Sequence, residues 1–253
     1  MIPPKISIGP LTVHLYGVIM ALAIYVGYLL ARKRANFYKI PLKHFEDPIL
    51  LVPLVLGFAL ARSYHVLDNI SYYSQNSLQI FNLAGGGMGI MGGILGIFLG
   101  FAIVAKIKKL KVLTVFDLVA PSVLLGQAIG RIGNWINQEG FGPPTNLPWG
   151  VFINPQNRPI QFFASSHFHP TFFYEAILDL AFFFILLKLS KKLKNPGQTF
   201  ALYLMLYAVG RLAAEFFRID TFILSGIKVA YVISTLLIII GFLLFFQKAK
   251  SKS

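Results

Sequence analysis

Three arginines, Arg62, Arg131 and Arg211, stand within long apolar stretches of the sequence. An ionisable side chain in such a setting is costly unless it is paired or hydrated, so each is a candidate for function. A guanidinium is permanently charged and presents a fork of N–H donors that matches the oxygens of a phosphate. The three residues therefore favour binding of an anionic phosphate, such as a phospholipid headgroup, and stabilisation of negative charge that develops on it.

Polar residues accompany two of these arginines. In the run GRIGNWINQEGFG, Arg131 is followed by Asn134, Asn137 and Glu139. Arg211 has Glu215 one helical turn further on, so an intrahelical ion pair without a ligand is an alternative there. The three guanidiniums are expected to exceed the nearby carboxylates in number, which would leave positive charge for a ligand.

The composition places these residues in a membrane protein. Of 253 residues, 56% are hydrophobic and 13% are charged, and the mean hydropathy is +0.69. No cysteine is present, which excludes a disulfide framework and a nucleophilic thiol of the protein's own. The spacing of His167 and His169 implies no metal. We expect no cofactor. We also expect no nucleic-acid partner, because a net charge of +14 has a topological explanation in a membrane protein.

Seven windows are long and apolar enough to cross a bilayer about 30 Å thick. Their approximate limits are 12–31, 49–67, 87–105, 115–136, 171–188, 198–217 and 227–247. The sequence therefore predicts an all-α, polytopic membrane protein, with residues 1–253 forming a single integral-membrane domain. A proline-rich connection over residues 137–170 is predicted to be an irregular external cap within that domain.

The distribution of cations predicts the orientation. Sixteen Lys and Arg residues, including Lys248, Lys250 and Lys252, fall on one side of the seven windows, and Lys5, Arg158, Arg218 and Lys228 fall on the other. By the positive-inside rule the N-terminus is external and the C-terminus is cytoplasmic. Arg62, Arg131 and Arg211 then lie at the external ends of their spans, on the side where His14 and Tyr16 open the first span. For Arg62 there is an alternative without function: an arginine at the end of a span can extend its guanidinium to the membrane–water interface.

Glycines at four-residue spacing mark the start of the third span, GGGMGIMGGILG from Gly85. Such spacing is typical of close helix packing, with close approach of the backbone to a ligand as the less common alternative. The segment SYYSQNSLQIFNL before it mixes aromatic and amide side chains and is expected to lie in the headgroup layer.

The run GRIGNWINQEGFGPPTNLPWG, residues 130–150, closely resembles the signature of bacterial prolipoprotein diacylglyceryl transferases. Shorter elements resemble the same family in the same order: IGPLTVHLYG, GFALARSYHV, HPTFFYEA and YAVGRLAAEFFR. Together these elements cover nearly the whole chain. The resemblance implies seven spans with an external N-terminus, in agreement with the charge distribution.

The resemblance also implies an activity in the bacterial inner membrane, with the active site facing the outer leaflet. It implies transfer of the diacylglyceryl group of phosphatidylglycerol to the lipobox cysteine of a preprolipoprotein signal peptide, forming a thioether and releasing glycerol 1-phosphate. The catalytic residues so implied are Arg131, Arg211, Tyr16, Asn134 and Glu139. Those expected to bind substrate are Arg62, His14, Gly142, Tyr207, Glu215 and Met91. Membrane lipids are expected as further partners.

Met91 departs from the family pattern, because a histidine proposed as the base for the thiol usually stands there. Glu139, His14 or a water held by Tyr16 could take that role, or the positive field alone could produce enough thiolate. A catalytically weakened relative that still binds phosphatidylglycerol or lipoprotein precursors is an alternative. An anion transporter is a further one, but we find no internal repeat that supports it.

Replacing Met91 with histidine tests the first of these alternatives. General-base assistance is typically worth about 10² to 10⁴ in rate, so M91H should hold or raise turnover if the base is merely missing. The measurement is the rate of thioether formation on a lipobox peptide. Zero activity in both forms would instead indicate a catalytically silent protein.

Overall fold

The computed structural model of the chain describes residues 3–9, 11–82, 86–219, 221, 223–224 and 226–247. Gly85, Lys248, Lys250 and Lys252, which entered the sequence arguments, lie outside these residues. The chain divides into two compact units. One consists of Met1–Lys33 with Asp117–Ser253, and the other of Arg34–Phe116.

Seven helices of at least 18 residues occur in the described part of the chain, close to the seven predicted windows. They are α1 (Leu15–Arg34), α2 (Leu51–Asp68), α4 (Ile90–Ile107), α5 (Val112–Asn137), α6 (Thr171–Ser190), α7 (Gln198–Glu215) and α8 (Val229–Phe246). Five of them, namely α1, α2, α4, α5 and α8, are long and apolar enough to cross a membrane. The protein is therefore a multi-pass membrane protein, whereas spanning by α6 and α7 stays a prediction.

Short elements add to these helices in ways that hydropathy did not predict. Three antiparallel pairs of strands occur among the described residues: β1 (Lys5–Ile8) with β2 (Leu11–His14), β3 (Val151–Phe152) with β4 (His167–Phe168), and β5 (Ile223–Leu224) with β6 (Ile227–Lys228). The short helices are α3 (Ile70–Gln75), η1 (Ala35–Tyr38), η2 (Leu42–Phe45), η3 (Pro48–Leu50), η4 (Ser77–Phe81), η5 (Pro155–Asn157) and η6 (Ile160–Phe162).

The predicted start of the first span at residue 12 is wrong, because that position lies in a hairpin. Residues 11–14 alternate apolar and polar side chains and pair with Lys5–Ile8, and the helix begins only at Leu15. Gly9 sits in the turn with φ +61°, which a glycine adopts without steric cost. His14 thus ends a strand and does not open a helix.

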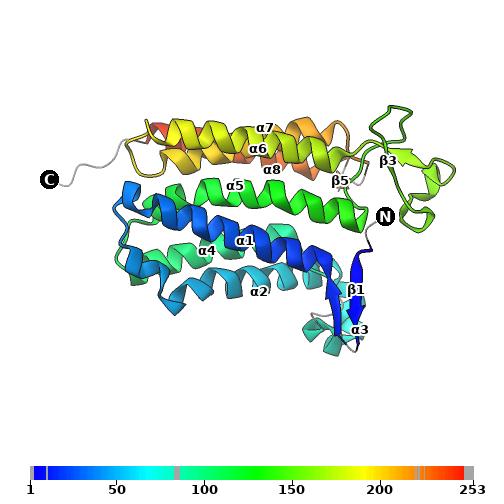
Figure 1. The fold of residues 1–253 in the computed structure, drawn as a ribbon, viewed down its shortest axis with the longest axis horizontal. Helices are drawn as coiled ribbons and strands as arrows, with labels where there is room; N and C mark the ends of the chain where they lie inside the picture. The colour runs from blue at the N-terminus through cyan, green and yellow to red at the C-terminus, as the bar shows by residue number, and fades with distance from the viewer. Residues whose placement is uncertain are drawn as a thin grey trace. The chain divides into compact units, whose positions relative to one another are not determined.

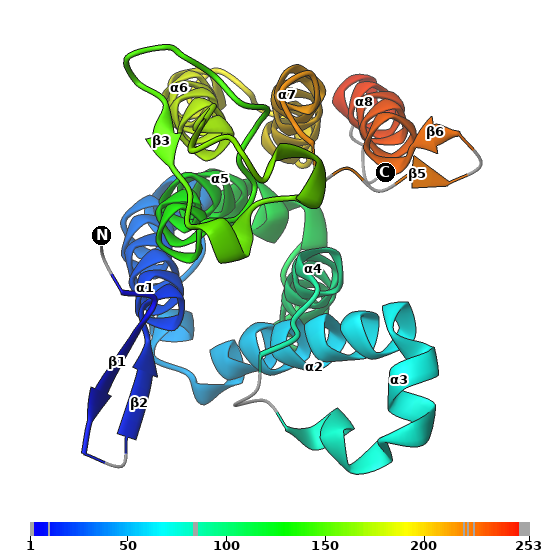
Figure 2. The ribbon, with the colours of Figure 1, turned by 90° about the vertical axis from the view of Figure 1, so that its right-hand side faces the viewer.

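In the unit of residues 34–116, α2 packs along α4 over much of its length. Glycines make this approach possible: a Cβ on Gly92 would collide with the carbonyl of Leu60, and a Cβ on Gly96 would collide with that of Leu56. The packing interpretation of the glycine spacing is therefore confirmed at Gly92 and Gly96. The segment α3–η4 follows the end of α2 (Figure 2), and its Leu78 and Phe81 are largely exposed, at 85% and 82%.

In the other unit, α6, α7 and α8 lie alongside one another (Figures 1 and 2). Helix α1 packs on α5, where Gly27 faces Ser122 and the ring of Tyr16 covers Gly133. Asp117 on α5 accepts hydrogen bonds from the backbone N–H of Gly197 and of Phe200, at 2.7 and 2.8 Å. This carboxylate therefore satisfies free donors at the N-terminus of α7, where negative charge is favourable.

Gly96→Ala tests the α2–α4 packing. The added methyl group meets the backbone of α2, which has little room to move, so the variant should lose about 1–3 kcal/mol in free energy of unfolding. Thermal unfolding of the detergent-solubilised protein measures the loss.

Gly93→Ala in the same helix is the matched control. A Cβ there meets the Cβ of Ala61 at 3.6 Å and the carbonyl oxygen of Gly57 at 3.9 Å, which are ordinary contacts, and alanine is the better helix former. Its melting temperature should stay at or above that of the parent. Equal melting temperatures for G93A and G96A would refute the packing argument.

Candidate functional site

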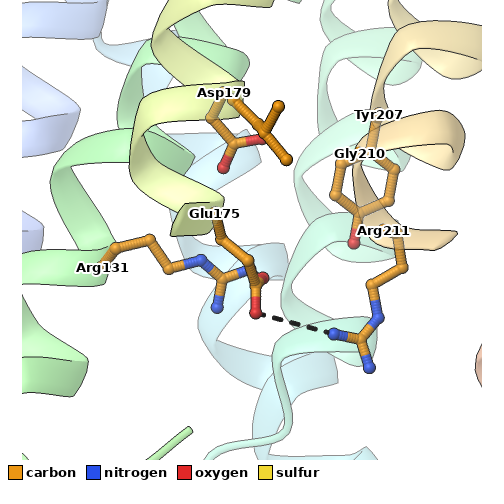
Figure 3. Close-up of a pocket in the computed structure, with 7 residues that line it drawn as sticks. Arg131, Glu175, Asp179, Tyr207, Gly210 and Arg211 are labelled. Carbon is orange, nitrogen blue, oxygen red and sulfur yellow. Dashed lines mark ion pairs between the residues drawn. The ribbon is translucent and has the colours of Figure 1, made fainter. Parts of the chain in front are cut away.

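A single carboxylate, that of Glu175, lies at the centre of the guanidinium groups. Glu175 stands in the second turn of α6 and its side chain is only 5% exposed. Its Oε2 pairs with Nη2 of Arg131 on α5. Its Oε1 lies 3.2 Å from Nη1 of Arg218, just beyond α7, and 3.9 Å from Nη1 of Arg211 on α7. Figure 3 shows Arg131 and Arg211 reaching toward it from either side.

Glu215 is a second carboxylate of this cluster. It is fully buried, and its Oε2 lies 2.6 Å from Nη2 of Arg211. Its Oε1 lies 3.8 Å from Nζ of Lys228. Neither oxygen accepts a hydrogen bond among the described residues, so the pairing rests on charge and distance. The ion pair that the i, i+4 spacing predicted is therefore present.

A small cavity adjoins these groups. It holds about 10 Å³, close to the space of one water molecule. The lining residues are Arg131, Glu175, Leu178, Asp179, Tyr207, Gly210 and Arg211. Asp179 is 5% exposed, and its Oδ2 has no hydrogen-bond partner within the described ranges. The cavity thus brings together two of the predicted arginines, the predicted Tyr207 and an unsatisfied acceptor (Figure 3).

Arg131 is also linked to the residues that follow it in the chain. Its Nη1 donates to Oδ1 of Asn134, at 3.3 Å, and Nδ2 of Asn134 donates to Oε1 of Glu139, at 3.0 Å. Asn137 Nδ2 donates to the same oxygen at 3.4 Å. The two amides therefore fix the exposed carboxylate of Glu139 relative to the guanidinium, and the ring of Tyr16 packs on Gly133 within the same run.

Gly142 has a steric function. Its N–H donates to the carbonyl of His169 at 2.8 Å, and a Cβ at this position would lie 2.5 Å from the carbonyl oxygen of Phe217 and 2.6 Å from Oγ1 of Thr171. Only a residue without a side chain lets the chain pass between the start of α6 and the segment after α7. The cap packs against the start of α6 through a small core formed by Phe141, Ile153, Phe168 and Phe172.

The guanidinium of Arg62 is hydrogen-bonded to backbone carbonyls of its own unit. Its five N–H groups donate to the carbonyls of Gln79, Ile80, Asn82, Gly86 and Gly87. It therefore fastens the η4 segment and the glycine loop to the end of α2, and in this conformation no donor is left for a phosphate. The substrate contact predicted for Arg62 requires some of these hydrogen bonds to break. Met91, 36% exposed, lies in the first turn of α4 in the same unit.

Four cations pair with two carboxylates in this cluster: Arg131, Arg211 and Arg218 with Glu175, and Arg211 and Lys228 with Glu215. Asp179 lines the adjoining cavity, and Glu139 is linked to Arg131 through Asn134. The expected surplus of positive charge stays a prediction. Sequence reasoning missed Glu175, Asp179, Arg218 and Lys228. The rule that selected the arginines could have found the first two, because both are ionisable residues within an apolar stretch and Glu175 lies in the run HPTFFYEA.

The fold and the site define a multi-pass membrane protein with a buried guanidinium–carboxylate cluster, of the kind that can bind an anionic headgroup. Comparison with known proteins gives the family. The family description "Prolipoprotein diacylglyceryl transferase" matches residues 3–247, and the chain belongs to this family. The resemblance inferred from the motifs is therefore confirmed.

Similar proteins come from distant bacteria. A phosphatidylglycerol–prolipoprotein diacylglyceryl transferase of Acaryochloris marina is 41% identical over 244 residues, covering 95% of this chain and 88% of the relative. The protein of that name from Staphylococcus haemolyticus is 38% identical over 94% of this chain and 85% of its own. That of Thermotoga maritima is 38% identical over 93% and 80%.

Gly142→Ala tests the steric function of that glycine. The methyl group would displace either the cap or the start of α6, so the variant should lose about 1–3 kcal/mol in free energy of unfolding and most of its activity. Gly126→Ala on α5 is the control, because a Cβ there meets nothing within 4 Å. Thermal unfolding and limited proteolysis of the cap measure the effect. A G142A protein as stable as G126A would show that Gly142 serves another purpose.

Proposed function

We propose that this chain transfers the diacylglyceryl group of phosphatidylglycerol to a prolipoprotein. Family membership over residues 3–247 supports this reaction and this pair of substrates. The observation that carries the proposal is the convergence of Arg131 and Arg211, from α5 and α7, on one buried carboxylate beside a cavity. Forked donors that hold a carboxylate in this way can also hold a phosphate.

The chemistry that fits these residues is substitution at a glyceryl carbon. The sulfur of the lipobox cysteine forms a C–S bond to that carbon while the C–O bond to phosphate breaks. Glycerol 1-phosphate then leaves with the electron pair of that bond, and the thiol proton passes to a base. The chain has no cysteine of its own, so the prolipoprotein supplies the sulfur. The product is a thioether.

In this proposal Arg131 and Arg211 stabilise the phosphate oxygens, which gain charge as the C–O bond breaks. Asn134 and Glu139 orient Arg131 through the chain of hydrogen bonds described above. Tyr207 faces the same cavity. Glu139 is the candidate base that the geometry supports best, because it is exposed and is held by two amides near Arg131. His14 and a water held by Tyr16 stay as alternatives.

We further propose the membrane arrangement that the charges predict. All seven long helices cross the bacterial inner membrane as one integral domain, with the N-terminus and the 137–170 cap outside and the C-terminus in the cytoplasm. The arginine cluster then faces the outer leaflet. At the predicted cytoplasmic side Lys108 pairs with Asp47, and Lys108 lowers the pKa of that carboxyl chiefly through this hydrogen bond.

A catalytically weakened relative is the second candidate, and Met91 is the observation that favours it. Such a protein would bind phosphatidylglycerol or the prolipoprotein and form little thioether. Complementation of a bacterial strain depleted of this transferase separates the two, because only an active enzyme restores growth.

Arg131→Ala and Arg211→Ala test the proposed reaction. Each should lower thioether formation by about 10² to 10³, the typical effect of removing one group that stabilises transition-state charge. The lysine variants should retain part of the activity, because they keep the charge and lose the fork. The measurement is labelled lipid transferred to a lipobox peptide, per folded protein.

Arg34→Ala serves as the control, since Arg34 donates to the hydroxyl of Tyr38 in a predicted basic loop and should leave transfer unchanged. Activity like that of the parent in R131A or R211A would remove that residue from the mechanism.

A further inference from the structure

The two oxygens of Glu175 face different arginines. Oε2 pairs with Arg131, and Oε1 lies nearer to Arg218, at 3.2 Å, than to Arg211, at 3.9 Å. Arg131 and Arg211 line the cavity, whereas Arg218 does not belong to its lining. Glu175 therefore bridges two cavity-lining guanidiniums and one guanidinium outside the lining.

Glu175 occupies the position that an anionic ligand of these arginines would need. The cavity beside it has room for about one water molecule, at about 10 Å³, so a phosphate group does not fit while the carboxylate stays. Nη2 of Arg131, one of the groups that could donate to a phosphate oxygen, is already paired with Oε2. Access for a phosphate thus requires Glu175 to move.

The side chains of Arg131, Arg211 and Arg218 are only 15–18% exposed, which explains why a carboxylate is there. Guanidiniums removed from water without a counter-charge are strongly destabilising, so an empty site needs an anion of its own. A phosphodiester carries one negative charge, as a carboxylate does. Exchange of one for the other leaves the net charge of the cluster unchanged, and Arg218 can hold the displaced carboxylate.

Building on the proposed function, we propose that Glu175 is a positioning residue that holds Arg131 and Arg211 in place of the phosphate and is displaced onto Arg218 when a phosphate ester binds. The apparent affinity for the ligand is then reduced by the fraction of protein in which Glu175 keeps the site closed. The ligand class is a phosphate ester, in the form of a lipid headgroup or a soluble glycerol phosphate.

Glu175→Gln separates this role from a merely structural one. Glutamine has nearly the same size and has no charge, so it competes poorly for guanidiniums. We expect the KM for phosphatidylglycerol in mixed micelles to fall about tenfold with kcat no higher than in the parent, and the inhibition constant of glycerol 1-phosphate to fall alike. If only the KM for phosphatidylglycerol falls, the ligand that displaces Glu175 is the lipid headgroup. If the inhibition constant of glycerol 1-phosphate falls as well, the ligand is the phosphate ester itself.

Two comparison variants sharpen the test. Glu175→Asp keeps the charge and should restore a KM near that of the parent. Asp47→Asn removes a carboxylate that pairs with Lys108 outside the site, and should leave the KM at the parent value. An equal fall of the KM in D47N would show a general charge effect and overturn the inference.

Arg218→Gln tests the same inference by an expected change of the KM in the opposite direction. It can still be measured if E175Q fails to fold. Without Arg218, Glu175 has only the cavity arginines to pair with, so the KM should rise about tenfold. An unchanged KM in R218Q, or an E175Q protein that is folded and active with an unchanged KM, would overturn the inference alone. Absence of thioether product from the parent protein, together with tighter glycerol 1-phosphate binding by E175Q, would instead refute the proposed function and support the displacement.

Discussion

Charge balance in a medium with little water is the constraint on which the candidate site depends. Arg131 and Arg211 come from different helices, and each would be costly in this setting without an anion nearby. Glu175 supplies that anion from a third helix, so the ion pairs also connect α5, α6 and α7 at this end of the helices. A site built in this way is closed when empty and favours ligands that can replace a carboxylate.

Close backbone contacts make this arrangement possible. Gly142 lets the chain pass between the start of α6 and the segment after α7, and Gly133 lets the ring of Tyr16 rest on α5. Neither glycine has a functional side chain, yet each lets the residues of the site come close together. In the other unit Gly92 and Gly96 do the same for α2 and α4. An added methyl group would collide with backbone carbonyls at Gly92, Gly96 and Gly142, and with the ring of Tyr16 at Gly133.

Much of the helical pattern could be predicted because hydrophobicity is a local property of the chain. The window 171–188 corresponds to α6 (Thr171–Ser190), and the window 198–217 to α7 (Gln198–Glu215). The hairpin that ends at His14 was missed, because an apolar window of ordinary length does not separate a short strand from the first turn of a helix. The ion pair of Arg211 with Glu215 was predictable because both residues belong to one helix.

By itself, the sequence determined the membrane class, the family motif around Arg131 and the residue types able to hold a phosphate. Only the tertiary structure decided that Glu175 lies among three guanidiniums and that the cavity beside it is small. It also decided that Arg62 donates its hydrogen bonds to backbone carbonyls. The physical reason is that hydropathy and helical spacing act over a few residues. Charge pairing acts through space between segments far apart in the chain, and its outcome depends on how the helices pack.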